Sequence, residues 1–226
     1  MSGAVPADPR QFADLHAIVA RVASMAGIPK PRVYIINDAA PNAFATGRNE
    51  RHAATAFTTG ILTLLTPEEL EGVVAHELSH IKNRDILVGT IAVVLAGFVA
   101  IIGDVFLRAQ LFGGRSDENR SGLFAIIGIV AAILAPLAAT LIQLSISRRR
   151  EYLADASGAL LTHKPANLAS ALGKLAAHHR PLAKASTATA HLFIANPFGN
   201  RRVSFAKLFA THPPLEDRIR LLLRQR

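Results

Sequence analysis

The clearest pattern in the chain is a change from short amphipathic segments to two long apolar ones. Residues 86–107 and 123–146 are almost uninterrupted apolar runs; the first contains one formal charge, Asp104, and the second contains none. Each run is close to the ~20 apolar residues that a helix needs to cross a bilayer. A pair of buried core helices is the alternative, although core helices of this length usually keep a polar face. We therefore predict a transmembrane hairpin, joined by the polar loop 108–122.

The sequence before the first apolar run predicts helices beside a small sheet. From Asp8, a candidate N-cap, apolar residues recur at helical spacing as far as Met25. Residues 32–36 (RVYII) have the composition of a strand, and residues 52–62 (HAATAFTTGIL) alternate as a second strand. The segment 37–47 between them is rich in turn-forming residues.

Helix signals also surround the hairpin. Residues 66–69 (TPEE) combine a Thr cap, a Pro at the first helical position and a Glu at the third, which predicts a helix start. After the second apolar run, residues 147–161 and 165–179 are predicted to form two helices. Residues 178–202 are predicted to be irregular, and residues 212–226 to form a closing amphipathic helix.

The helix that begins at Pro67 contains the sequence HELSH, which is a candidate metal site. His76 and His80 are four residues apart, so on a helix their rings project from the same face and can hold one ion. Glu77 lies about 100° further round the helix, where it can reach a water molecule rather than the ion. Two surface histidines on an ordinary helix are the alternative, so a third ligand is needed to decide.

The hairpin itself supplies the argument for that third ligand. His80 stands about six residues before the first apolar run, and Glu151 stands about five residues after the second. Both ends of a hairpin return to the same face of the membrane, so each residue should lie roughly 8 to 9 Å beyond its helix. Glu118, in the connecting loop, should lie on the opposite side. A catalytic zinc takes three protein ligands and leaves one position for water.

Two aspartates are candidates for the support of these ligands. Asp155 is four residues after Glu151 on the same predicted face, and a metal-binding His usually donates its other ring proton to a carboxylate. We predict this role for Asp155, with a plain surface aspartate as the alternative. Asp85 is a weaker candidate and can equally serve as a cap or a salt-bridge partner.

Composition narrows the chemistry further. The 226 residues include no cysteine, so a metal must be held by His and carboxylates. The formal charge of +9 can indicate nucleic acid, but the chain has no nucleic-acid-binding motif and few aromatic residues, so we expect no nucleic-acid partner. More basic residues flank the open end of the hairpin than its loop. Because basic residues gather on the cytoplasmic side of a membrane, we expect the catalytic face in the cytoplasm. The open end has Lys82, Arg84, Arg148, Arg149 and Arg150; the loop has Arg108, Arg115 and Arg120.

Four motifs occur in order: NAFATG, AHELSHIKNRD, SRRREYLADASGALLT and THPPLEDRIRLL. With them, residues 8–226 closely resemble the HtpX family of membrane zinc proteases, relatives of the CAAX prenyl proteases. The resemblance implies one Zn²⁺ per chain, held by His76, His80 and Glu151, with Glu77 as the catalytic residue. The expected fold is mainly α with a small β-sheet (α+β), a single zincin-like metalloprotease domain. The transmembrane hairpin is inserted between the helix with the HELSH sequence and the helix with the third ligand.

The resemblance gives roles to two further residues. In the prenyl protease relatives, the His of the H-P-P motif lies near zinc and stabilises the transition state; His212 has that position here. Asn42, in NAFATG, is expected to bond the substrate backbone beside a strand that can pair with an extended peptide. Without the resemblance, His212 is a helix-entry residue and Asn42 only indicates a turn.

The resemblance also implies a function. We expect an endopeptidase of the inner (cytoplasmic) membrane that cuts misfolded or damaged membrane proteins in stress quality control. A peptidase for prenyl or lipid tails, and a membrane scaffold with an inactive zinc site, are the alternatives. Family members usually carry two more transmembrane segments before the catalytic domain, whereas this sequence begins MSGAVPADPRQF without an apolar run. We expect this difference to affect membrane integration and not the zinc chemistry.

Overall fold

The architecture is given by a computed structural model. It describes residues 3–112, 128, 130, 133–135, 148–178, 180–183, 192–198 and 213–224. Most of the second predicted apolar helix, 123–146, and the predicted transition-state residue His212 lie outside these residues.

A four-stranded mixed sheet forms one part of the molecule. The strands are β1 (Ala4–Pro6), β2 (Arg32–Ile36), β3 (Ala43–Thr46) and β4 (Ala54–Thr58). Their spatial order is β1-β2-β4-β3; β2 and β4 run parallel, and the other two pairs run antiparallel. This order makes β3 an edge strand, and β3 is the strand that contacts α3.

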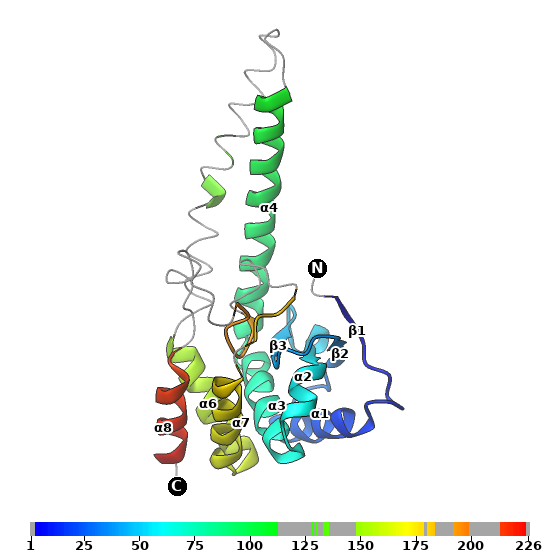
Figure 1. Ribbon diagram of the computed structural model, residues 1–226, viewed down its shortest axis with the longest axis vertical. Helices are drawn as coiled ribbons and strands as arrows, with labels where there is room; N and C mark the ends of the chain where they lie inside the picture. The colour runs from blue at the N-terminus through cyan, green and yellow to red at the C-terminus, as the bar shows by residue number, and fades with distance from the viewer. Residues whose placement is uncertain are drawn as a thin grey trace.

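Helices make up most of the rest. They are α1 (Ala13–Ala26), α2 (Thr59–Leu64), α3 (Pro67–Lys82), α4 (Asp85–Phe112), α6 (Arg148–Thr162), α7 (Pro165–Ala177) and α8 (Leu215–Arg224), with a 3-10 turn, η1, at Glu50–His52. Helix α3 runs through the middle of the body, between α1 and the sheet on one side and α6 and α7 on the other (Figure 1). Helix α4 extends away from this body.

The central place of α3 explains why it is buried on nearly all sides. Its apolar residues Val73, Val74, Leu78 and Ile81 are at most 1% exposed and belong to the main core cluster. That cluster also includes apolar residues of α1, β4 and α7. The polar residues of α3 that face the other way are therefore enclosed by protein, which sets the conditions for their chemistry.

Most predicted elements are present, with shifted boundaries. The strand at 32–36 and the helix after Thr66 are confirmed as β2 and α3. The predicted helices at 147–161, 165–179 and 212–226 are confirmed as α6, α7 and α8. The first helix begins later than predicted, at Ala13. Its expected cap, Asp8, instead accepts a hydrogen bond from the backbone N–H of Arg10 (2.8 Å) in a separate turn.

Two expectations about the sheet were wrong. The segment 37–47, predicted to be a turn, contains β3, because residues 43–46 pair antiparallel with β4. The predicted strand 52–62 divides into β4 and α2. The division falls at Thr58, whose hydroxyl accepts a hydrogen bond from the N–H of Ile61 (3.2 Å) and so caps the new helix.

Helix α4 covers the first predicted apolar segment, 86–107, so the helix itself is confirmed. Counting only the residues that the structure describes, no helix is both long enough and apolar enough to cross a membrane. The transmembrane hairpin therefore stays a prediction.

Candidate metal centre

The helix with the HELSH sequence is fixed at its start by a capping box. The Thr66 hydroxyl accepts from the N–H of Glu69 (3.3 Å), and the Glu69 carboxylate accepts from the N–H of Thr66 (2.8 Å). The same carboxylate also accepts from Ser170 and Lys174 of α7, each at 2.7 Å. The beginning of α3 is thus tied both to its own cap and to a neighbouring helix.

Three side chains from α3 and α6 meet around one point. The two imidazole Nε2 atoms of His76 and His80 are 3.2 Å apart. The Glu151 carboxylate lies 3.5 Å from Nε2 of His80 and 3.7 Å from Nε2 of His76. One ligand atom from each of the three lies within 4.8 Å of the others. Two imidazole nitrogens and one carboxylate are the donor set of many catalytic zinc sites.

A glycine lets α6 come close enough for this meeting. A Cβ atom on Gly158 would lie 3.0 Å from the backbone N of His76 and 3.2 Å from the carbonyl carbon of Ala75. These neighbours are backbone atoms of α3 and cannot rotate away. The absence of a side chain at 158 therefore sets the separation of the two helices that present the ligands.

The outer ring nitrogens of both histidines face carboxylates. Nδ1 of His76 lies 2.9 Å from Asp155, and Nδ1 of His80 lies 3.0 Å from Asp85. A proton held on each Nδ1 leaves the lone pair of each Nε2 directed to the shared point, as a metal site requires. Asp155 thus lies where the sequence predicted it, and Asp85 holds the equivalent place beside His80.

The pKa values of His76 and His80 are shifted in opposite directions. Burial and the Arg218 guanidinium lower the pKa of His76 to about 4, so this ring is neutral at pH 7. Burial also acts to lower the pKa of His80, but the hydrogen bond to Asp85 and the charges of Glu151 and Glu77 outweigh it and raise this pKa to about 9. The carboxylates around His80 therefore favour positive charge at this point, which suits a bound cation.

Arg218 is the site residue that the sequence analysis missed. Its fully buried guanidinium, from α8, donates two hydrogen bonds to Asp155 (2.7 and 2.8 Å) and lies 3.4 Å from Glu151. Burial would raise the pKa of Asp155, but Arg218 outweighs it and lowers this pKa to about 2. A signal existed in the sequence, because Arg218 interrupts the apolar stripe of Leu215 and Leu222.

Glu77 lies close to His80 and Glu151 and is not part of the three-residue cluster. Its side chain is nearly inaccessible, at 2% exposure, and burial raises its pKa to about 7. The backbone of Ala45, in the edge strand β3, and the charges of His80 and Arg218 act against this shift without cancelling it. A carboxylate with a pKa near neutrality can both accept and return a proton at physiological pH.

Asn42 is buried beside the sheet, and its side-chain amide bonds to three backbone groups. The amide donates to the carbonyl of Ala195 (3.0 Å) and accepts from the N–H groups of Ala43 (3.1 Å) and Ala195 (3.3 Å). Ile194 also donates to the carbonyl of Ala43 (3.0 Å). Asn42 therefore fixes the segment 192–198 along the outer edge of β3, and contact with substrate stays a prediction.

Comparison with known proteins agrees with this geometry. The model of peptidase family M48 matches residues 9–226. The chain belongs to peptidase family M48. The predicted class, a metalloprotease, and the resemblance to the HtpX family are thereby confirmed.

Two M48 relatives show how far the similarity extends. The chain is 51% identical over 226 residues to a protease HtpX homolog of Thermoanaerobacter pseudethanolicus, covering 97% of this chain and 74% of that protein. It is 56% identical over 211 residues to a protease HtpX homolog of Pyrococcus furiosus, covering 92% and 72%.

The fold has a counterpart among solved structures. The crystal structure of Ste24p of S. mikatae matches with a TM-score of 0.54 at 19% identity and covers 97% of this chain. The chain spans about half (51%) of the Ste24p chain. The predicted α+β metalloprotease fold is thereby supported.

Proposed function

We propose that this chain is a zinc-dependent endopeptidase that cleaves polypeptides beside a membrane. The observation that carries the proposal is the convergence of His76, His80 and Glu151 beside the buried carboxyl of Glu77. The donor set fits zinc, because each imidazole presents its Nε2 atom while a carboxylate faces its Nδ1. When bound, zinc supplies Lewis-acid activation of a water molecule and of the scissile carbonyl.

The protein's own groups account for the proton transfers. The Glu77 carboxylate takes a proton from the attacking water and later delivers it to the leaving amine. Its raised pKa suits both steps near pH 7. From the family resemblance, His212 stabilises the developing negative charge and Asn42 aligns the peptide.

The membrane part of the proposal comes from the sequence and the family. Residues 86–107 and 123–146 form a transmembrane hairpin, and basic residues at its open end place the metal centre on the cytoplasmic side. The substrates are then cytoplasmic segments of misfolded or damaged membrane proteins. The hydrophobic length of each run and the family to which the chain belongs support this placement.

The substitution Glu77→Gln tests the mechanism. It removes the proton acceptor and keeps the size of the side chain, so zinc content measured by mass spectrometry should match that of the wild type. Cleavage of casein in detergent should fall by about 10²- to 10⁴-fold. A Glu77→Gln enzyme that cleaves casein at the wild-type rate would refute the mechanism.

Two further arms of this assay separate the alternatives. Chelation should stop wild-type cleavage, and added zinc should restore it; a wild type that binds zinc without cleaving any peptide would instead be a scaffold. A peptide with a prenylated C-terminus, tested beside casein, distinguishes a general endopeptidase from a lipid-tail peptidase. Cleavage of the prenylated peptide alone would favour the second function.

A further inference from the structure

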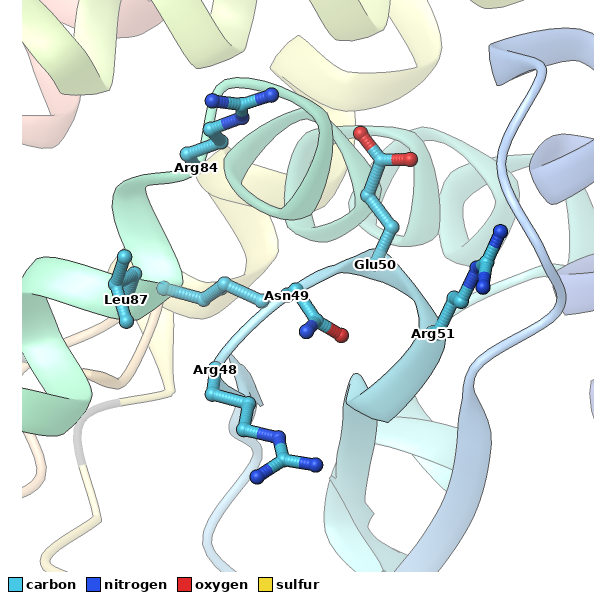
Figure 2. Close-up of a pocket in the computed structure, with 7 residues that line it drawn as sticks. Arg48, Asn49, Glu50, Arg51, Arg84 and Leu87 are labelled. Carbon is cyan, nitrogen blue, oxygen red and sulfur yellow. The ribbon is translucent and has the colours of Figure 1, made fainter.

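A hollow lies where α4 leaves the body of the protein, outside the metal centre. It has a volume of about 500 Å³. Residues 48–51, which include the start of η1, line it on one side, and Arg84, Ile86 and Leu87 line it on the other (Figure 2). The hollow thus joins the β3–β4 connection to the base of the long apolar helix.

The charge of the hollow is positive. Three arginines, Arg48, Arg51 and Arg84, line it with exposed side chains, against one carboxylate, Glu50. Among the residues that the structure describes, none of these arginines forms an ion pair; Arg48 contacts the ring of His52 at 3.1 Å. Three guanidinium groups without carboxylate partners around one hollow favour an anionic ligand, and phosphate suits their planar fork best.

The backbone at Arg84 adds a second observation. Arg84 has a left-handed conformation with φ of 62°, at the turn between α3 and α4. Glycine usually takes this position after a helix, because other residues pay about 1 kcal/mol or more for it. An arginine stands here instead, at the rim of the hollow, where Figure 2 shows its side chain.

An exposed apolar stripe begins at the same hollow. Leu87 lines the hollow and is also the first residue of a row on α4 with spacing of four and three, which keeps the row on one face. The exposed fraction increases along the row: Leu87 37%, Ile91 42%, Val94 51%, Phe98 56% and Ile101 63%. Charge at the base and apolar surface above it form an amphiphilic site.

We infer that this hollow binds the phosphate headgroup of an anionic phospholipid, whose acyl chain lies along the stripe from Leu87 to Ile101. The guanidinium groups neutralise the phosphate, and the stripe covers the hydrocarbon. Each arginine near an anionic membrane surface contributes about 1 kcal/mol, which is roughly a five-fold preference. A soluble phosphate would bind the arginines but would not cover the apolar stripe. A nucleic acid would likewise leave the stripe, which begins at the base of α4, without a binding partner.

This inference rests on the proposed membrane placement of α4 and goes beyond the proteolytic function. The test uses the full chain, reconstituted into bilayers of phosphatidylcholine and phosphatidylglycerol. Spin-labelled phosphatidylglycerol and spin-labelled phosphatidylcholine, added in turn, report by electron paramagnetic resonance how much of each lipid the protein immobilises. Wild type should immobilise phosphatidylglycerol about five-fold or more in preference to phosphatidylcholine.

The triple variant R48Q/R51Q/R84Q should lose most of this preference, because it removes the positive charges of the three arginines that line the hollow. The matched control R10Q/R180Q/R224Q removes the same number of charges from exposed arginines away from the hollow and should keep the preference. Casein cleavage in detergent should be retained by both variants, which shows that they fold.

Four results would overturn the inference. Equal immobilisation of the two lipids by wild type, or equal loss in both triple variants, would refute the site and leave the membrane placement intact. No immobilised lipid of either kind would refute the membrane placement as well. Saturable binding of inorganic phosphate in neutral detergent, lost in R48Q/R51Q/R84Q, would assign the hollow to a soluble phosphate.

Discussion

Arg218 neutralises two buried carboxylates, Asp155 and Glu151, that would otherwise repel each other beside the proposed ligands. Its guanidinium is fully buried and donates to Asp155, whose carboxylate lies against Nδ1 of His76. Removal of one partner from a buried ion pair leaves a desolvated charge and is far more costly than loss of a surface pair. Arg218 is therefore a positioning residue.

The substitution Arg218→Met should destabilise the protein by about 3–5 kcal/mol, measured by urea denaturation in detergent. The matched control is Arg220→Met, two residues further along α8, where the side chain is exposed and pairs with Asp217. This control should unfold near the wild-type urea concentration. Equal midpoints for the two variants would show that Arg218 does not support the site.

The raised pKa of Glu77 makes a prediction about pH. Burial raises this pKa from the ordinary 4.5 to about 7, so the fold favours the protonated carboxyl. Stability from this group is therefore present below about pH 4.5 and lost as pH rises through 7. In metal-free protein, we compare the free energy of unfolding of Glu77→Gln with that of the wild type. This difference should favour the variant by about 2–3 kcal/mol more at pH 8 than at pH 4. A constant difference across this range would contradict the raised pKa.

The convergence of His76, His80 and Glu151 could be predicted from the sequence, because helical spacing and the expected hairpin depend only on sequence positions. Asp155, predicted from its spacing to Glu151, lies against the ring of His76. Arg218 depends on the packing of α8 against α6, which no local pattern specifies. Its place on the apolar stripe of α8 was a signal of burial, but arginine is usually expected to be exposed, so this signal was overlooked.

At the scale of elements, the approach of α6 to α3 decides the separation of the ligands. Gly158 faces the backbone of α3, and a side chain there must push the helices apart by a few tenths of an ångström. Glu151 lies about two turns earlier on the same helix, so it moves with α6. The distance between the carboxylate and the two imidazoles therefore depends on a residue that has no side chain.

The substitution Gly158→Ala should destabilise the protein by about 1–3 kcal/mol and weaken zinc binding, measured by competition with a chromophoric chelator. The matched control is Gly173→Ala on α7, where a Cβ would meet nothing within 4 Å. That change should be neutral or stabilise the helix by up to about 1 kcal/mol. If both variants bind zinc equally well, the close approach at 158 is not needed.

Elements with local signals were the ones that the sequence predicted well. The capping box before Pro67 gave α3 its start, and the β-branched run at 32–36 gave β2. Strand β3 was missed because its four residues, AFAT, follow a run of turn-forming residues, and its pairing with β4 is not visible in a local window. The predicted strand 52–62 is divided into β4 and α2 at Thr58. A threonine can continue a strand or cap a helix through its hydroxyl, so the sequence did not decide between the two.

At the scale of the whole molecule, the absence of cysteine allows a direct test of orientation. Ser24→Cys places a thiol on an exposed position of α1, and Ser116→Cys places one in the predicted loop of the hairpin. In sealed inverted membrane vesicles, a membrane-impermeant maleimide should label position 24 and not position 116. The reverse pattern would place the metal centre on the outer side, and labelling of both would refute the hairpin.

The link between α8 and the metal centre has a consequence for the order in which the enzyme is made. Arg218 follows His76 by 142 residues and Asp155 by 63 residues. A chain that leaves the ribosome presents both histidines and both acids long before their guanidinium arrives. Until α8 docks, the buried carboxylates of Asp155 and Glu151 lack their guanidinium partner, so we expect peptidase activity to appear only after the last helix has been made.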